Sequence, residues 1–347
     1  MRSLARELPV APLAGTALAV AVFALLPLLL ADTNEYRFGF VAAYFIAALG
    51  LNILTGFAGQ ISLGHGGFML IGAYTTEILS VHHGVRDIWT IPIAGLVTGA
   101  IGFLFGFPAL RLRGVYLALA TFAIPIALIS LAKKFSHFTG GGGGQALTRN
   151  VSGHEAYVLA WPIAGVLFAL AWFMLRGRLG RSFRAVAESE IAAASSGVNI
   201  ALAKTTAFGI SAFYAGVGGA LYAIAIGFVN PDTFPIGLSI LLLTGIVIGG
   251  LGSLSGTLFG ALFVEYVPLY APQLLEHAQK PVGIHLDSKA AGAPAVIYGL
   301  ILLGFLYLFP SGIAGLLRAA FRAVEKQVYN PRRKEPPGPL VSTRREA

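Results

Sequence analysis

The sequence has 347 residues, of which 56% are hydrophobic and only 11% are charged, and its mean hydropathy is +0.78. An average soluble domain carries about 25% charged residues, so this composition excludes an ordinary soluble protein. The chain contains no cysteine, which excludes disulfides and thiolate metal sites, and its net charge of +9 must be judged by where the Lys and Arg residues lie.

Apolar runs long enough to cross about 30 Å of hydrocarbon as helices recur along the whole chain. They predict an all-α, polytopic integral membrane protein with about ten transmembrane or re-entrant helices, at 12–31, 38–56, 61–80, 90–108, 114–132, 156–175, 206–226, 236–250, 253–270 and 292–310. The first run could instead be a signal peptide, because Arg2 and Arg6 precede it. We expect an uncleaved anchor, since no small-x-small cleavage site ends the run and another span follows at once.

The basic residues predict an orientation. If the N-terminus is cytoplasmic, most of the 24 Lys and Arg residues fall in cytoplasmic segments, so we expect both termini in the cytoplasm. Residues 311–347 then form a basic cytoplasmic tail, most simply a solvated segment near anionic membrane lipid. Nucleic-acid binding is not expected.

Residues 51–68, LNILTGFAGQISLGHGGF, place five glycines, amides, hydroxyls and an imidazole between two apolar runs. Polar groups and irregular backbone at membrane depth are costly unless protein or water satisfies them. We therefore expect a non-ideal helix or a re-entrant hairpin that faces the inside of the bundle.

Few ionisable residues lie in the predicted spans: His65, with Glu77 and Glu265 near predicted ends. This scarcity argues against an ion-coupled carrier. HExxH, GxxxxGK[ST] and paired catalytic carboxylates are all missing from the sequence, so we predict no catalytic residues and no metal site. The loop FTGGGGGQALTRN (138–150) is interpreted as flexible, with an anion-binding backbone nest as the alternative.

The largest segment between later spans, residues 176–205, predicts a short capped helix. Ser189 can cap its N-terminus, Glu190 favours the positive end of the helix dipole, and Gly197 suits the left-handed residue after its end. This segment is either a solvated connector or a docking element for a cytoplasmic partner. Farther along, the glycines of TGIVIGGLGSLSGTLFGALF predict close helix packing and a break near Gly250–Ser255.

Five blocks carry a resemblance to a known family. LNILTGFAGQISLGHGGFMLIGAYTTEIL, RLRGVYLALAT, FTGGGGG, GRSFRAVAESEIAAASSGVNIALAKTTAFGISA and GLGSLSGTLFGALF, in this order, resemble the LivM-type permease of branched-chain amino acid ABC importers, within the LivH/LivM superfamily. The resemblance covers roughly residues 38–310. It implies a transmembrane permease domain at 1–310 that includes a cytoplasmic coupling loop at 176–205.

The resemblance also implies partners and site residues. Such a permease pairs with a second, LivH-type permease, is driven by two cytoplasmic ATPase subunits that bind the ATP, and receives solute from a periplasmic binding protein at the bacterial inner membrane. The chain itself would need no cofactor and would not be an enzyme. The implied translocation-pathway residues are Asn52, Thr55, Gly59, Gln60, Ser62 and His65. The implied ATPase-coupling residues are Arg181, Arg184, Glu188, Glu190, Ala193 and Gly197.

Several alternatives stay open at this point. Asn52, Gln60 and His65 could form hydrogen bonds between helices rather than bind solute. Glu188 and Glu190 are expected to find partners across the ATPase interface, and the alanines to allow its close approach. The solute is expected to be a branched-chain or similar neutral amino acid. Urea or a short amide is the alternative within this class, an ion-coupled carrier is the alternative from another class, and a membrane-embedded enzyme is a distant third.

Overall fold

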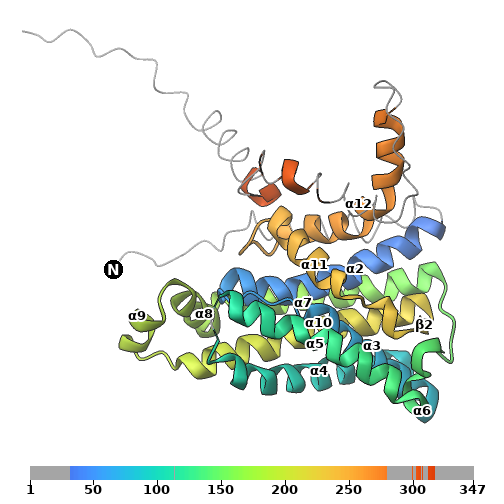
Figure 1. Cartoon of the computed structure of the whole chain (residues 1–347), viewed down its shortest axis with the longest axis horizontal. Coiled ribbons are helices and arrows are strands. Elements are labelled where there is room, and N and C mark those ends of the chain that lie inside the picture. The colour runs from blue at the N-terminus through green and yellow to red at the C-terminus, as the bar shows by residue number, and fades with distance from the viewer. Residues whose placement is uncertain are drawn as a thin grey trace, which may run out of the picture.

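The computed structural model describes residues 32–112, 114–279, 299, 302–305, 307 and 312–316. This part of the chain is a bundle of long helices with one short pair of strands (Figure 1). The predicted spans at 12–31 and 292–310, both termini and the tail at 311–347 fall wholly or largely outside the described residues.

The described helices agree with the predicted spans to within a few residues at most ends. They are α2 (Asp32–Asn52), the π-helical turn η2 (Ile53–Phe57), α3 (His65–His83), α4 (Asp87–Ala109), α5 (Val115–Lys134), α7 (Gly153–Arg176), α8 (Arg178–Glu188), α9 (Glu190–Ser195), α10 (Ile200–Ile226), α11 (Ile236–Gly249) and α12 (Gly256–Gln279). Six stretches of the described chain are long and apolar enough to cross a membrane: Glu35–Phe57, Asp87–Pro108, Val115–Lys134, Gly153–Arg176, Ile200–Ile226 and Pro231–Gly249. The protein is therefore a helical, multi-pass membrane protein.

Helix α10 lies at the centre of the bundle and packs against α2, α3 and α4. Small residues allow this packing: a Cβ atom at Gly72 of α3 would collide with the backbone of Gly216 in α10. Backbones this close gain van der Waals contact that larger side chains would prevent. Helix α7 covers α2 on the outside, and α11 and α12 pack on each other and on α2.

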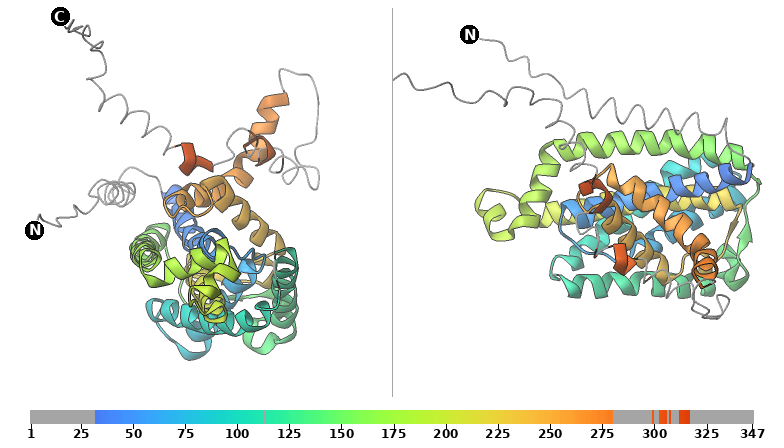
Figure 2. Two further views of the ribbon diagram at one scale, coloured as in Figure 1. Left: turned by 90° about the vertical axis from the view of Figure 1, so that its left-hand side faces the viewer. Right: turned by 90° about the horizontal axis from the view of Figure 1, so that it is seen from above.

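The two ends of the bundle differ (Figures 1 and 2). Helices α8 and α9 project from one end, and β1 (Gln145–Ala146) and β2 (Phe228–Val229) lie at the other. The strands pair antiparallel, with Gln145 opposite Val229, so the fold is not purely helical.

The interpretation of the glycine-rich loop as flexible is wrong. Its residues form the short helix α6 (Ser136–Thr139), the 3-10 turn η3 (Gly141–Gly143) and strand β1. The Thr139 hydroxyl donates to the Ala132 carbonyl at 2.7 Å and accepts from the Gly141 N–H at 3.2 Å. The Leu147 N–H donates to the Gly227 carbonyl at 3.0 Å, so both sides of the loop are tied to regular structure.

Candidate functional site

The polar stretch at 51–68 forms a break between α2 and α3, as predicted. Helix α2 widens into the π-helical turn η2, Gly59 adopts a positive φ of 68°, and regular helix resumes at His65. The break frees backbone N–H groups that need acceptors inside a membrane protein. The Leu63 N–H donates to Thr121 Oγ1 of α5 at 2.9 Å, and the Gly66 N–H donates to Ser239 Oγ of α11 at 2.9 Å.

Asn52 fastens this break to a second one. Its amide is fully buried and donates to the Ser253 carbonyl at 3.0 Å and to Thr257 Oγ1 at 2.9 Å, while its Oδ1 accepts from the Gly252 N–H at 2.9 Å. Gly250 has a φ of 112°, and residues 250–255 separate α11 from α12, which confirms the predicted break there. Asn52 is thus occupied by interhelical hydrogen bonds.

His65 takes part in a buried chain of hydrogen bonds. Its Nε2 lies 2.8 Å from Ser211 Oγ on α10, and the Ser211 hydroxyl donates to the Gly50 carbonyl at 2.7 Å. Because serine has only one hydroxyl proton, Nε2 must carry the hydrogen and donate to Ser211. The chain ties the start of α3 to the end of α2 through α10.

Thr55 and Ser62 stabilise the break locally. The Thr55 hydroxyl donates to the Gln60 carbonyl at 3.0 Å, and Ser62 Oγ accepts from the Gly64 N–H at 3.3 Å. Both bonds are made within a few residues along the chain. These two hydroxyls therefore provide hydrogen-bond partners for backbone groups that the break has removed from regular helix.

Gly59 and Gln60 connect the break to α8. An added Cβ at Gly59 would lie 3.1 Å from the Ala187 side chain, so the two elements touch. Gln60 is 5% exposed and lines a cavity of about 100 Å³ with Ala187, Glu190 and Lys204. The Lys204 ammonium of α10 lies 2.6 Å from Glu190 Oε1 of α9 in a largely buried ion pair. The break, α8, α9 and α10 therefore meet at one place.

Residues 178–195, here called the α8–α9 element, have the predicted cap and stop. Ser189 Oγ accepts from the Ala192 N–H at 3.3 Å, and Gly197 has a φ of 81°. Helix α8, which precedes the cap, was not predicted from the sequence. Its face toward the bundle is apolar and includes Phe183 and Val186, both buried.

The family can now be identified. The family described as branched-chain amino acid transport system / permease component matches residues 34–309. The chain belongs to this family. The LivM permease proteins of the high-affinity branched-chain amino acid transport systems of Salmonella typhimurium and Escherichia coli K12 are each 36% identical to it over 253 residues, which is 64% of this chain. The alignment covers 59% of each LivM protein, so the chain spans less than two thirds of the length of these relatives.

The LivH permease protein of Escherichia coli K12 is 27% identical over 299 residues, or 79% of this chain and 92% of LivH. No solved structure matches the chain significantly. Among the described residues of the chain, no group of three or more His, Asp or Glu side chains could bind a metal ion.

Four of the six expected coupling residues make contacts within their own chain. Arg181 donates to the Arg176 carbonyl at 3.3 Å and Arg184 to the Leu175 carbonyl at 3.2 Å, so both close the turn between α7 and α8. Glu190 forms an ion pair with Lys204 of its own chain. Ala193 is 2% exposed and packs inward. Glu188 and Gly197 are exposed.

Ile191 was not singled out from the sequence. Its side chain is 82% exposed on α9, beside exposed Ala192, Ala194 and Ser195. It is the one large apolar residue in a short helix that otherwise holds Glu, Ala and Ser.

The polar partners of the break were also missed: Thr121, Ser211, Ser239, Thr257 and Lys204. Each is a polar residue within or at the start of an apolar helix. In a membrane protein such a residue needs a partner, but the sequence does not say which one.

Glu77 departs from expectation as well. It was expected near the end of a span, yet it is fully buried on α3, six residues before the helix ends. Neither carboxylate oxygen has a hydrogen-bond partner among the described residues. By contrast Glu265 lies 3.6 Å from Arg37. A buried carboxyl in a membrane bundle is a candidate functional group in its own right.

Proposed function

We propose that the chain is the transmembrane permease subunit of an ABC importer for branched-chain or similar neutral amino acids. Membership of the permease family over residues 34–309 is the observation that carries this proposal. In it, a LivH-type permease completes the translocation pathway, two separate ATPase subunits supply the energy, and a periplasmic binding protein delivers the solute. The chain catalyses no covalent reaction and binds no cofactor.

The proposed topology places both termini and the α8–α9 element in the cytoplasm, and β1, β2 and α6 on the periplasmic side of the bacterial inner membrane. Residues 1–310 form the permease domain with about ten spans, residues 176–205 its coupling loop, and residues 311–347 a basic tail near anionic lipid. The clustering of Lys and Arg in the proposed cytoplasmic segments supports this orientation.

The pathway residues have different parts in this proposal. Asn52, Thr55, Ser62 and His65 hold the break in shape through the hydrogen bonds described above. Gly59 and Gln60 lie where the break meets the α8–α9 element. Movement of the α8–α9 element would be transmitted to α10 through the Lys204–Glu190 ion pair. It would be transmitted to the break before α3 through the Gly59–Ala187 contact.

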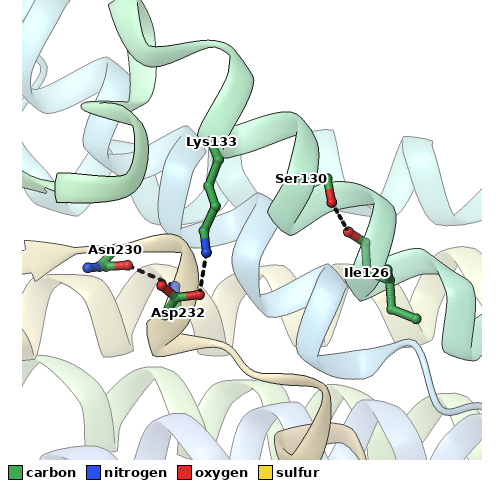
Figure 3. Close-up of polar contacts among 5 residues, drawn as sticks. All are labelled: Ile126, Ser130, Lys133, Asn230 and Asp232. Atoms are coloured by element: carbon green, nitrogen blue, oxygen red, sulfur yellow. Dashed lines mark hydrogen bonds and ion pairs between the residues drawn. The ribbon is translucent and has the colours of Figure 1, made fainter.

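At the proposed periplasmic end, charged residues are paired within the chain. Lys133 of α5 reaches Asp232 of the 3-10 turn η4 (Pro231–Thr233) at 2.8 Å, and Asn230 Oδ1 accepts from the Asp232 N–H (Figure 3). Both charged side chains are substantially exposed, at 44% and 65%. An exposed pair contributes little stability, about 0–1 kcal/mol, so its charges remain available to steer a binding protein.

Reversing Lys133 to Glu should therefore leave the thermal stability of the transporter nearly unchanged while weakening its stimulation by the binding protein about 3- to 10-fold at low salt. The loss should shrink as ionic strength rises, because exposed charges are screened. The readout is ATPase activity titrated with binding protein at two salt concentrations. Lys134→Glu, one residue on, is the matched control for net charge, and equal effects from both variants would refute a specific role of the Lys133–Asp232 pair.

The test of the proposed function is reconstitution. The chain, a LivH-type permease, two ATPases and the binding protein are placed in liposomes, and uptake of labelled leucine, urea and acetamide is compared. The proposal predicts leucine uptake that requires ATP and the binding protein. Uptake of urea or acetamide alone would favour the short-amide importer.

An ion-coupled carrier is the second candidate, and the buried Glu77 is the observation that favours it. Ionophores separate the two functions in the same liposomes. Uptake that ionophores abolish and that needs no ATP would establish the carrier and refute the importer.

A further inference from the structure

We propose that four arginines at the turn between α7 and α8 bind the headgroup of an anionic phospholipid at the membrane surface. These residues, Arg176, Arg178, Arg181 and Arg184, are here called the arginine corner. The site adds a lipid ligand that the proposed transport function does not include, and its position depends only on α7 crossing the membrane.

Helix α7 places the arginine corner at the edge of the hydrocarbon. The apolar stretch that can cross a membrane runs from Gly153 to Arg176, so the corner begins where this stretch ends. Helix α7 runs along the outside of the bundle and turns into α8 at its end (Figure 2). All of its exposed residues between positions 158 and 173 are apolar, and Phe173 near the end is 69% exposed. This face borders lipid acyl chains, and the corner borders their headgroups.

The corner carries four positive charges and no adjacent negative side chain. Residues 176–184, RGRLGRSFR, contain no acidic residue, and no carboxylate of the described residues forms an ion pair with any of the four arginines. The carbonyl end of α7 contributes about half a negative charge. Arg181 and Arg184 donate to carbonyls at this end, and they offset its charge. A net positive charge remains at the corner.

Two features hold the guanidinium groups at the corner. The Arg176 guanidinium lies 4.0 Å from the centre of the Trp172 ring, in a cation–π contact. Arg178 and Arg181 are three residues apart on α8, so they lie on one side of the helix. The hydrogen bond from Arg181 to the Arg176 carbonyl draws this side of α8 back to the end of α7. The guanidinium groups are therefore gathered near one another while their side chains stay exposed.

This arrangement matches the chemistry of a phospholipid. Guanidinium groups bind phosphate oxygens through paired N–H donors. Leu179, between two of the arginines, is 45% exposed and offers apolar surface beside that of Phe173. A free phosphate ion would contact the arginines alone, whereas a phospholipid also covers the apolar side chains. A zwitterionic headgroup brings its own cation to the corner, so an anionic lipid is favoured.

The position of the corner gives lipid binding a consequence. Arg178 and Arg181 belong to the first turns of the α8–α9 element, and Arg176 belongs to the membrane-spanning helix before it. A phosphate held by both sides of the turn would fix the start of α8 at the membrane surface. The lipid would thus hold the base of the α8–α9 element.

Photo-cross-linking tests the site in the complete transporter, reconstituted in phosphatidylcholine nanodiscs. Phosphatidylglycerol with a photoreactive diazirine near its glycerol is added, and the labelled residues are identified by mass spectrometry. We expect labelling concentrated at residues 172–181, and unlabelled phosphatidylglycerol should suppress it in a saturable way. Additional phosphatidylcholine should not suppress it, and neither should inorganic phosphate. Suppression by phosphatidylcholine would overturn the preference for an anionic lipid, and suppression by inorganic phosphate would make the ligand a free anion.

Replacing Arg176 and Arg178 together by glutamine should weaken the competing phosphatidylglycerol at least 10-fold, because each basic residue near an anionic surface strengthens binding about 5-fold. Arg86→Gln with Lys134→Gln removes the same charge from exposed positions at the opposite end of the bundle, and should leave the value unchanged. Replacing Arg176 and Arg178 by lysine should retain most of the binding. Equal effects of the two glutamine pairs, or labelling spread evenly along α7, would overturn the proposal. The competition between lipids in the wild type decides the question even if a variant fails to fold.

Discussion

Replacing Asn52 by leucine should lower the free energy of unfolding by about 2–5 kcal/mol, the largest loss that we expect from one polar substitution. Leucine is close to asparagine in size but offers no hydrogen bonds. The Gly252 N–H and the Thr257 hydroxyl would lose their buried partner, and two helix breaks would lose the link between them. Transport should fall with the amount of folded protein.

The measurement is thermal unfolding of the purified transporter, beside its specific activity per folded molecule. Asn199→Leu is the matched control, because Asn199 is an exposed helix cap whose side chain accepts from the Leu202 N–H, and its loss should cost only about 1 kcal/mol. If Asn52→Leu were as stable as this control and yet inactive, Asn52 would be a solute ligand rather than a link between helices.

Replacing Ile191 by aspartate should abolish co-purification of the ATPases without impairing insertion of the permease. Ile191 is 82% exposed on α9, so the substitution leaves the fold of the chain intact. A buried apolar anchor at the centre of an interface typically contributes at least 2 kcal/mol, so the assembly should weaken by about 30-fold or more. A carboxylate buried at this position in the assembly would add a desolvation penalty.

Phe138→Asp is the matched control, since Phe138 is 51% exposed at the opposite end of the bundle. It should retain the ATPases fully. Retention in Ile191→Asp as well would make the α8–α9 element a solvated connector. Docking is tested at Ile191 rather than at Ala193 because Ala193 is buried, so a larger side chain there would disrupt α9 itself.

The sequence predicted the broken helix at 51–68 for a reason that applies to any bilayer. Five glycines and several polar residues cannot form an ordinary span, so a break facing protein was the remaining solution. The cap at Ser189 and the stop at Gly197 were equally local. The cap depends on the Ser189 side-chain oxygen, and the stop depends on the backbone conformation of Gly197. These features were predictable because each depends on neighbouring residues.

The partners of the polar residues were not predictable. Asn52 pairs with residues about 200 positions away, and His65 with Ser211, because the packing of α10 and α12 decides which side chains meet. Glu190 illustrates the same limit, since its carboxylate suited either an ATPase or Lys204. The glycine-rich loop was misjudged because its order comes from pairing with β2, which lies more than 80 residues later.

The most direct measurement is cross-linking from α9. Because the chain has no cysteine, Ile191→Cys and Phe138→Cys each carry a unique thiol in this subunit. A short thiol–amine cross-linker is applied to the assembled transporter, and the products are identified by mass spectrometry. Docking of the α8–α9 element predicts a cross-link to an ATPase from position 191 and none from position 138. A cross-link to the ATPase from position 138, or its absence from position 191 in an active transporter, would contradict the coupling role.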